Sequence, residues 1–242
     1  MTAFQTSSSA VVNFIPLPPS CVDAAIIDLD GTMVDTLGDF SEALNRMLQD
    51  LGLSPIDAGS IESMVGKGSE HLLRSVLKHV LPRYGADDVA IKIEELYSSA
   101  WASYQRHYLA INGQFAGVYD GVEAGLQALR ARGLRLACLT NKPTSFALPL
   151  LELKGLAGYF EHVFGGDAFE RKKPDPLPLL KTCEALGVSP ARTLMVGDSS
   201  NDAQAARAAG CPVVLVTYGY NHGQPVRAVD ADGFVDSLAQ LA

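Results

Sequence analysis

The chain has 242 residues, of which 48% are hydrophobic and 19% charged, with a formal net charge of −8. This balance suits one large globular domain, or a core domain with a smaller insert, and the negative charge argues against a protein that binds the phosphate backbone of nucleic acid. No apolar run approaches the roughly 18 residues of a membrane span. The first basic residue, Arg46, comes too late for a secretory signal, and the four cysteines lack zinc-site spacing. We therefore expect a soluble cytoplasmic protein without nucleic-acid or membrane partners.

The N-terminal half changes from a strand to helices only. Residues 1–20, with clusters of Ser and Pro, are expected to form a flexible extension. A strand follows and ends at Asp30. Apolar residues then recur at helical spacing, which predicts helices over about 37–51, around 61–64, over 72–81 and over 88–108. This change in composition indicates an inserted helical domain over residues 37–112.

From Gly117 onward, strands and helices alternate. The pattern predicts strands at 134–140, 163–164, 193–197 and 213–217, and helices at 121–132, 144–154, 174–186 and 201–209. Pro149 is expected to kink or divide the helix over 144–154. Strands that alternate with helices of this length predict βαβ units and a parallel sheet, so we expect an α/β fold.

Asp28 and Asp30 directly follow the buried apolar run 24–27. Two carboxylates two residues apart on an extended segment point the same way. Like charges at that distance repel unless one is protonated or a cation lies between them. The stretch therefore predicts a metal site, a carboxylic acid kept neutral, or both. A solvated turn with two incidental acids is the alternative.

Three further pieces occur at or near the ends of predicted strands. They are Thr140-Asn141, Lys173-Pro174, and Gly197-Asp198 with Asp202 four residues on. In parallel sheets, sites form at the carboxyl ends of strands. Carboxylate oxygens select a hard cation such as Mg²⁺, and a lysine and a hydroxyl beside it can stabilise a transferring phosphoryl group. Each piece alone also fits a turn, a surface charge or a helix cap, but their order and placement favour one site.

The two carboxylates of the first piece suggest a division of labour. One can attack phosphorus and form an aspartyl phosphate. The other can protonate the leaving oxygen and later take a proton from water, which contributes about 10²–10⁴-fold.

Residues 28–36, with the sequence Asp-Leu-Asp-Gly-Thr-Met-Val-Asp-Thr, resemble the first motif of the haloacid dehalogenase superfamily. Thr140, Lys173 and the stretch 197–202 resemble its second, third and fourth motifs, in that order. The resemblance implies a Rossmann-like parallel sheet core, made of residues 21–36 and 113–242, under an all-helical cap at 37–112.

The resemblance also implies roles for individual residues. Asp28 would be the nucleophile and Asp30 the acid/base, while Thr140, Asn141 and Lys173 would hold the phosphoryl group.

Mg²⁺ is the cofactor that the resemblance implies. Its ligands would be Asp28, the backbone carbonyl of Asp30, and Asp198. Asp202 would support the metal through water or from behind these ligands.

The carboxylate of Asp30 fits a phosphatase or phosphomutase, because dehalogenases and phosphonate hydrolases of this superfamily lack one there. The stretches 65–68, 140–143 and above all 217–223 resemble the bacterial phosphoglycolate phosphatases. That resemblance implies a small phosphorylated metabolite as partner, 2-phosphoglycolate, which is hydrolysed to glycolate and phosphate. Lys67 is then a candidate for binding the substrate carboxylate; a surface lysine is the alternative.

Other functions remain open at this stage. One is a broader sugar-phosphate phosphatase or a hexose phosphomutase of the same superfamily. Another is a phospho-aspartate signalling switch, against which the helical insert and Asp30 argue. The sequence does not determine the oligomeric state.

Overall fold

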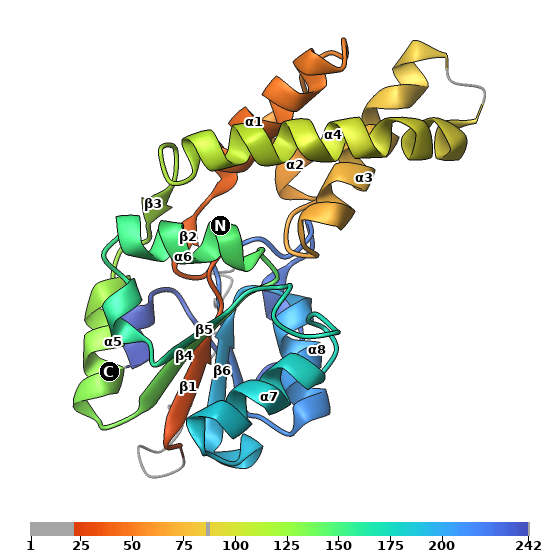
Figure 1. Cartoon of the computed structure of the whole chain (residues 1–242). Helices are drawn as coiled ribbons and strands as arrows, with labels where there is room; N and C mark the ends of the chain where they lie inside the picture. The colour runs from red at the N-terminus through yellow and green to blue at the C-terminus, as the bar shows by residue number, and fades with distance from the viewer. Residues whose placement is uncertain (1–21, 86–87, 242) are drawn as a thin grey trace, which may run out of the picture.

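The structure is a computed structural model that describes residues 22–85 and 88–241. Six parallel strands form a sheet with helices on both faces, and a layer of helices lies above it (Figure 1). The order across the sheet is β5 (His162–Phe164), β4 (Arg135–Leu139), β1 (Ala24–Ile27), β6 (Thr193–Gly197), β7 (Val213–Val216) and β8 (Gly233–Val235). This order, with all neighbours parallel, is that of the Rossmann sheet. The predicted α/β fold with a parallel sheet is confirmed.

The central strand β1 is apolar on both faces because helices cover both. Ala25 and Ile27 belong to one buried cluster and Ala24 and Ile26 to another, as expected from the alternation of side chains along a strand. Helices α5 (Val122–Ala131) and α6 (Thr144–Leu153) pack on the first face. Helices α7 (Leu177–Leu186) and α8 (Ser200–Ala209) pack on the second. Short 3₁₀ helices occur at Leu81–Tyr84, Ala157–Tyr159, Pro190–Arg192, Val226–Ala228 and Leu238–Leu241.

The segment between β1 and α5 is mainly helical and has its own buried cluster. It contains α1 (Leu37–Asp50), α2 (Ala58–Glu62), α3 (Ser69–Val80) and α4 (Val89–Ile111). The long α4 extends along this layer, and its Tyr104 and Tyr108 are fully buried in the cluster. Two short strands, β2 (Val34–Asp35) and β3 (Gly117–Val118), pair antiparallel where the chain enters and leaves these helices. The helices α1–α4 are called the cap below.

The return connection from the cap is fixed at both sides. The buried carboxylate of Asp39 accepts hydrogen bonds from the backbone amides of Gly113 (2.6 Å) and Phe115 (2.8 Å). On the core side, Nζ of Lys154 donates to the carbonyl oxygens of Gly113 (2.8 Å) and Ala116 (2.6 Å). The connection is therefore bonded to the first turn of α1 and to the end of α6.

Some details differ from the sequence-based expectations. Pro149 was expected to kink or divide its helix, and it does not divide it: α6 continues through it, since one proline removes one hydrogen bond while the apolar face of α6 stays packed on the sheet. Strand β1 ends at Ile27, before Asp28 and Asp30. The short strands β2, β3 and β8 were not predicted. The expected extension at 1–20 lies outside the described residues, and among those described no helix is both long and apolar enough to cross a membrane.

Candidate active site

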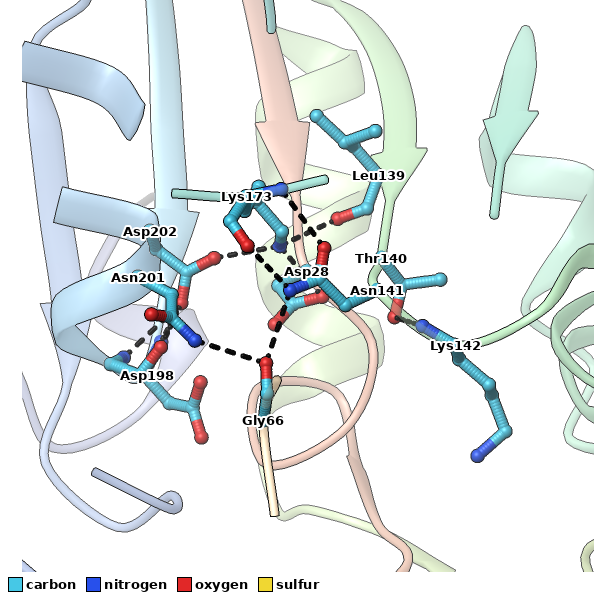
Figure 2. A network of polar contacts seen from close by, with 11 residues as sticks. Asp28, Gly66, Leu139, Thr140, Asn141, Lys142, Lys173, Asp198, Asn201 and Asp202 are labelled. Carbon is cyan, nitrogen blue, oxygen red and sulfur yellow. Dashed lines mark hydrogen bonds and ion pairs between the residues drawn. The ribbon is translucent and has the colours of Figure 1, made fainter. Parts of the chain in front are cut away.

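The carboxyl ends of three adjacent strands bring the predicted residues together. Asp28 follows β1, Thr140 follows β4 and Asp198 follows β6, and these strands are neighbours in the sheet. All three residues are buried. Figure 2 shows them around Lys173, which comes from the loop before α7. The structure therefore brings these residues together at one edge of the sheet, and their role as a site stays a prediction.

Lys173 is the central cation of this cluster. Its Nζ donates to the carbonyl oxygen of Leu139 (2.9 Å) and to Oδ1 of Asp202 (2.7 Å), and it lies 3.0 Å from Oδ1 of Asp28. The ammonium is thus surrounded by three oxygens in a buried environment. It can neutralise negative charge that arrives beside Asp28.

Asp202 holds this arrangement from behind. While its Oδ1 binds Lys173, its Oδ2 accepts from the backbone amides of Asp198 (3.3 Å) and Ser199 (3.2 Å) and from Oγ of Ser199 (2.8 Å). Asp202 and Ser199 form a capping box at the start of α8. A metal bound directly by Asp202 would have to displace one of these donors.

The electrostatics of the cluster follow from burial and from crowded carboxylates. Burial raises the pKa of Asp28 to about 7, with Lys173 opposing the shift and the carboxylates of Asp202 and Asp30 adding to it. Burial and the charges of Asp202 and Asp28 raise the pKa of Asp198 well above its usual range. Burial alone would lower the pKa of Lys173, but Asp202 and Asp28 outweigh it and raise that pKa. The cluster therefore favours additional positive charge.

A divalent cation fits this donor set. Carboxylate oxygens of Asp28, Asp198 and Asp202 lie within 4.8 Å of one another. Oδ1 of Asp28 is buried and, apart from its ion pair with Lys173 at 3.0 Å, has no hydrogen-bond partner among the described residues. Oδ2 of Asp198 accepts one from the backbone amide of Tyr220 at 2.6 Å, which fixes the carboxylate. Hard oxygen ligands in this number suit Mg²⁺.

Asp30 lies beside the cluster and faces the cap. Its Oδ1 accepts hydrogen bonds from Oγ1 of Thr36 and from Nζ of Lys142, both at 2.8 Å. Asp28 and Asp30 line the same pocket. Lys142 belongs to the stretch 140–143 that resembles the phosphoglycolate phosphatases, but the sequence did not predict it as a site residue. Its position directly after Thr140-Asn141 is the feature of the sequence that could have indicated this.

Thr140 and Asn141 have different environments. Oγ1 of Thr140 accepts from the backbone amide of Lys142 (3.2 Å), so its own proton can be donated to a phosphoryl oxygen. The side chain of Asn141 bonds to backbone only: Nδ2 donates to the carbonyls of Gly66 (3.1 Å) and Lys173 (2.9 Å), and Oδ1 accepts from the amide of Lys173 (3.1 Å). Asn141 therefore joins two core loops to the cap.

The cap side of the pocket is formed by Phe40 of α1, by Val65, Gly66 and Gly68, and by Ser69 and Leu72 of α3. Lys67 lies between two of these residues but is exposed and does not line the pocket. After burial, the charge of Lys67 contributes to lowering the pKa values of His71 and His222.

The stretch 217–223 packs directly against the site. A Cβ at Gly219 would lie 2.3 Å from Cβ of Asp198 and 2.3 Å from the carbonyl oxygen of Gly31, so this close approach requires glycine. Oη of Tyr220 accepts from the backbone amides of Thr36 (3.0 Å) and Leu37 (3.1 Å). The stretch thus connects Asp198 to the start of the cap.

Comparison with known proteins agrees with the motifs. Residues 22–210 match the family model of haloacid dehalogenase-like hydrolases. A phosphoglycolate phosphatase of Thiobacillus denitrificans is 45% identical over 94% of this chain and 96% of its own length, and a plasmid-encoded one of Cupriavidus necator is 47% identical over 90% of each. The crystal structure of a predicted phosphoglycolate phosphatase from Haemophilus somnus has a TM-score of 0.86 at 30% identity, covering 91% of this chain and 96% of that one. The resemblance inferred from the motifs is confirmed.

Proposed function

This chain belongs to the haloacid dehalogenase-like hydrolases, and we propose that it is a Mg²⁺-dependent phosphatase that hydrolyses 2-phosphoglycolate to glycolate and phosphate. The observation that carries the proposal is the buried cluster of Asp28, Asp198, Asp202 and Lys173 at the strand ends, beside the separately held Asp30. One carboxylate is free to attack phosphorus and a second is held for proton transfer. We also propose a cytoplasmic location, which cell fractionation tests.

The first half of the proposed reaction transfers the phosphoryl group to Asp28. A carboxylate oxygen of Asp28 forms a bond to phosphorus while the bond from phosphorus to the ester oxygen breaks. Asp30 gives its proton to that departing oxygen. Thr140 and Lys173 hold the phosphoryl oxygens.

The second half returns the enzyme to its starting state. Asp30 takes a proton from water, whose oxygen attacks phosphorus, and the bond to Asp28 breaks to release phosphate. Mg²⁺ held by Asp28, Asp198 and the backbone carbonyl of Asp30 would neutralise charge on the phosphoryl oxygens in both halves. Asp202 would act on the metal indirectly, since donors already occupy its oxygens.

The substrate carboxylate needs a partner on the cap side. Lys67 remains the proposed one: its exposed ammonium would have to turn inward from the loop between α2 and α3. Lys67→Ala should raise KM for phosphoglycolate while leaving KM for an alkyl phosphate without a carboxylate unchanged. An unchanged KM for phosphoglycolate would remove Lys67 from the site.

The test of the function is phosphate release from a panel of esters, with and without Mg²⁺. The panel holds 2-phosphoglycolate, glucose phosphates, sugar-acid phosphates and nucleotides. We expect Mg²⁺-dependent release with a kcat/KM preference of about 10²-fold or more for phosphoglycolate, a discrimination of about 2.7 kcal/mol. Comparable rates across sugar phosphates would replace the named substrate with a broader class. Isomerised sugar phosphate would indicate a mutase, and stable phosphorylation of Asp28 without release would indicate a signalling switch.

A further inference from the structure

Lys142 occupies an unusual position between core and cap. Its Nζ donates to Oδ1 of Asp30 (2.8 Å) and to Oη of Tyr108 (2.5 Å). The same atom lies 4.6 Å from the ring centre of Phe40 and 4.7 Å from that of Tyr108. Only 1% of the side chain is exposed. In Figure 2 it extends away from Asp28 and Lys173, so it serves a different part of the site.

Lys142 and Thr36 together fix the orientation of Asp30. Both donate to Oδ1, but they come from different parts of the chain: Thr36 directly precedes α1 of the cap, and Lys142 lies in the loop after β4. No described residue donates to Oδ2 of Asp30. The two donors therefore select Oδ2 as the oxygen that exchanges protons with the ester oxygen and with water.

The position of Lys142 depends on the cap. Burial of an ammonium is costly unless it is paired. Here the pairing comes from one core carboxylate and from groups of α1 and α4: the Phe40 ring, the Tyr108 ring and the Tyr108 hydroxyl. With the cap displaced, three of these four contacts would be lost and water would solvate the ammonium.

We propose that Lys142 is a positioning residue that orients Asp30 for proton transfer only when α1 and α4 are seated on the core. This inference rests on the proposed function, in which Asp30 protonates the leaving oxygen. It predicts that loss of Lys142 harms the cleavage of esters whose leaving group must be protonated, and spares those whose leaving group departs as an anion.

The test compares Lys142→Met, which keeps the length of the side chain, with wild type on 2-phosphoglycolate and on p-nitrophenyl phosphate. The readout is kcat/KM, which reports only the steps up to departure of the leaving group. We expect a loss of about 10²-fold on phosphoglycolate, the lower end of general acid contributions, and nearly unchanged cleavage of the aryl ester. Lys181→Met is the matched control, because Lys181 is an exposed lysine of α7 paired with Glu184.

Equal losses on both esters would overturn the proposal, since a structural defect affects both. A double variant is the second test. In an enzyme that already carries Asp30→Asn, Lys142→Met should cause no further loss of kcat/KM on phosphoglycolate. An additional loss would show that Lys142 acts independently of Asp30. If Lys142→Met does not fold, Tyr108→Phe replaces it. That variant removes only the hydroxyl. Its kcat/KM should fall on phosphoglycolate, by less than in Lys142→Met, and stay nearly unchanged on the aryl ester. No loss on phosphoglycolate, or equal losses on both esters, would refute dependence on the cap.

Failure of the proposed function is recognised separately. If the wild type does not cleave phosphoglycolate, the named substrate is wrong. The comparison between alkyl and aryl esters is then made with the alkyl phosphate that the wild type cleaves best, and it still decides the role of Lys142.

Discussion

The side-chain amide of Asn201, at the start of α8, donates a hydrogen bond of 3.1 Å to the carbonyl oxygen of Gly66 in the cap. Asn141 donates to the same oxygen from the opposite side of the site. The loop after β4 and the first turn of α8 thus both bind the Gly66 carbonyl (Figure 2), and Gly66 lines the same pocket as Asp28.

Asn201→Ala should weaken closure of the cap. One hydrogen bond is worth about 1 kcal/mol, so we expect a roughly fivefold loss in kcat/KM, mainly through KM. Asn201→Asp should be worse, because its carboxylate would face the Gly66 carbonyl without a donor. Steady-state kinetics check both variants. Wild-type KM in Asn201→Asp would show that this contact does not contribute to substrate binding.

Asp28→Asn should abolish turnover and leave the fold intact. Removal of a nucleophile costs about 10⁴-fold or more. Because Asp28 is buried beside other carboxylates, the amide should also raise the melting temperature of the metal-free protein. Phosphate release and thermal unfolding are measured together. Retained turnover would remove Asp28 as the nucleophile.

The stability of the metal-free protein should fall as pH rises. The folded pKa of Asp28 is about 7 against an ordinary value of 3.8, so between these values the folded state keeps a proton that the unfolded chain has lost. We expect a lower melting temperature at about pH 8 than at about pH 5.5 without Mg²⁺, because unfolding releases this proton between the two pKa values and is therefore favoured as the pH rises.

Mg²⁺ should reverse this trend, because a bound cation replaces the proton. The rise in melting temperature on adding Mg²⁺ should therefore be larger at the higher pH. Asp28→Asn is the control that separates this carboxylate from other groups titrating in the same range. A Mg²⁺ effect that does not depend on pH would argue against a metal site at Asp28.

Gly219→Ala should damage the metal site. The added methyl would lie 2.3 Å from Cβ of Asp198, so either the loop or the carboxylate must shift. Loss of support behind a metal ligand typically costs about 10–100-fold in affinity, and we expect that increase in the Mg²⁺ concentration for half-maximal activity. Gly158→Ala is the matched control, because no atom lies within 4 Å of its added methyl. Equal Mg²⁺ dependence in both variants would contradict the prediction.

The part of the site that could be predicted from sequence is the part that strand order determines. Asp28, Thr140 and Asp198 each follow an apolar run of strand length, and parallel strands end at one edge of the sheet. Lys173 could be included because of its motif. The spacing of these residues along the chain carries enough information to place them together.

The remainder depends on contacts between distant segments. Lys142 acquires its environment from α1 and α4, which local periodicity cannot place over the loop after β4. Tyr220 contacts both Asp198 and the start of the cap. From the sequence it could be recognised only as part of the stretch 217–223, without these contacts. Strands β2 and β3 have two residues each, too few for a periodic signal.

The position of β1 at the centre of the sheet has a consequence for biosynthesis. This strand is made first, yet its two neighbours, β4 and β6, are made only after the whole cap. During translation the apolar segment Ala24–Ile27 has no strand to pair with, whereas the cap helices contact one another through nearby segments. The cap should therefore acquire amide protection on the ribosome before β1 does, and β1 should be a binding site for chaperones until β6 emerges. Hydrogen exchange on stalled nascent chains would contradict this order if β1 were protected first.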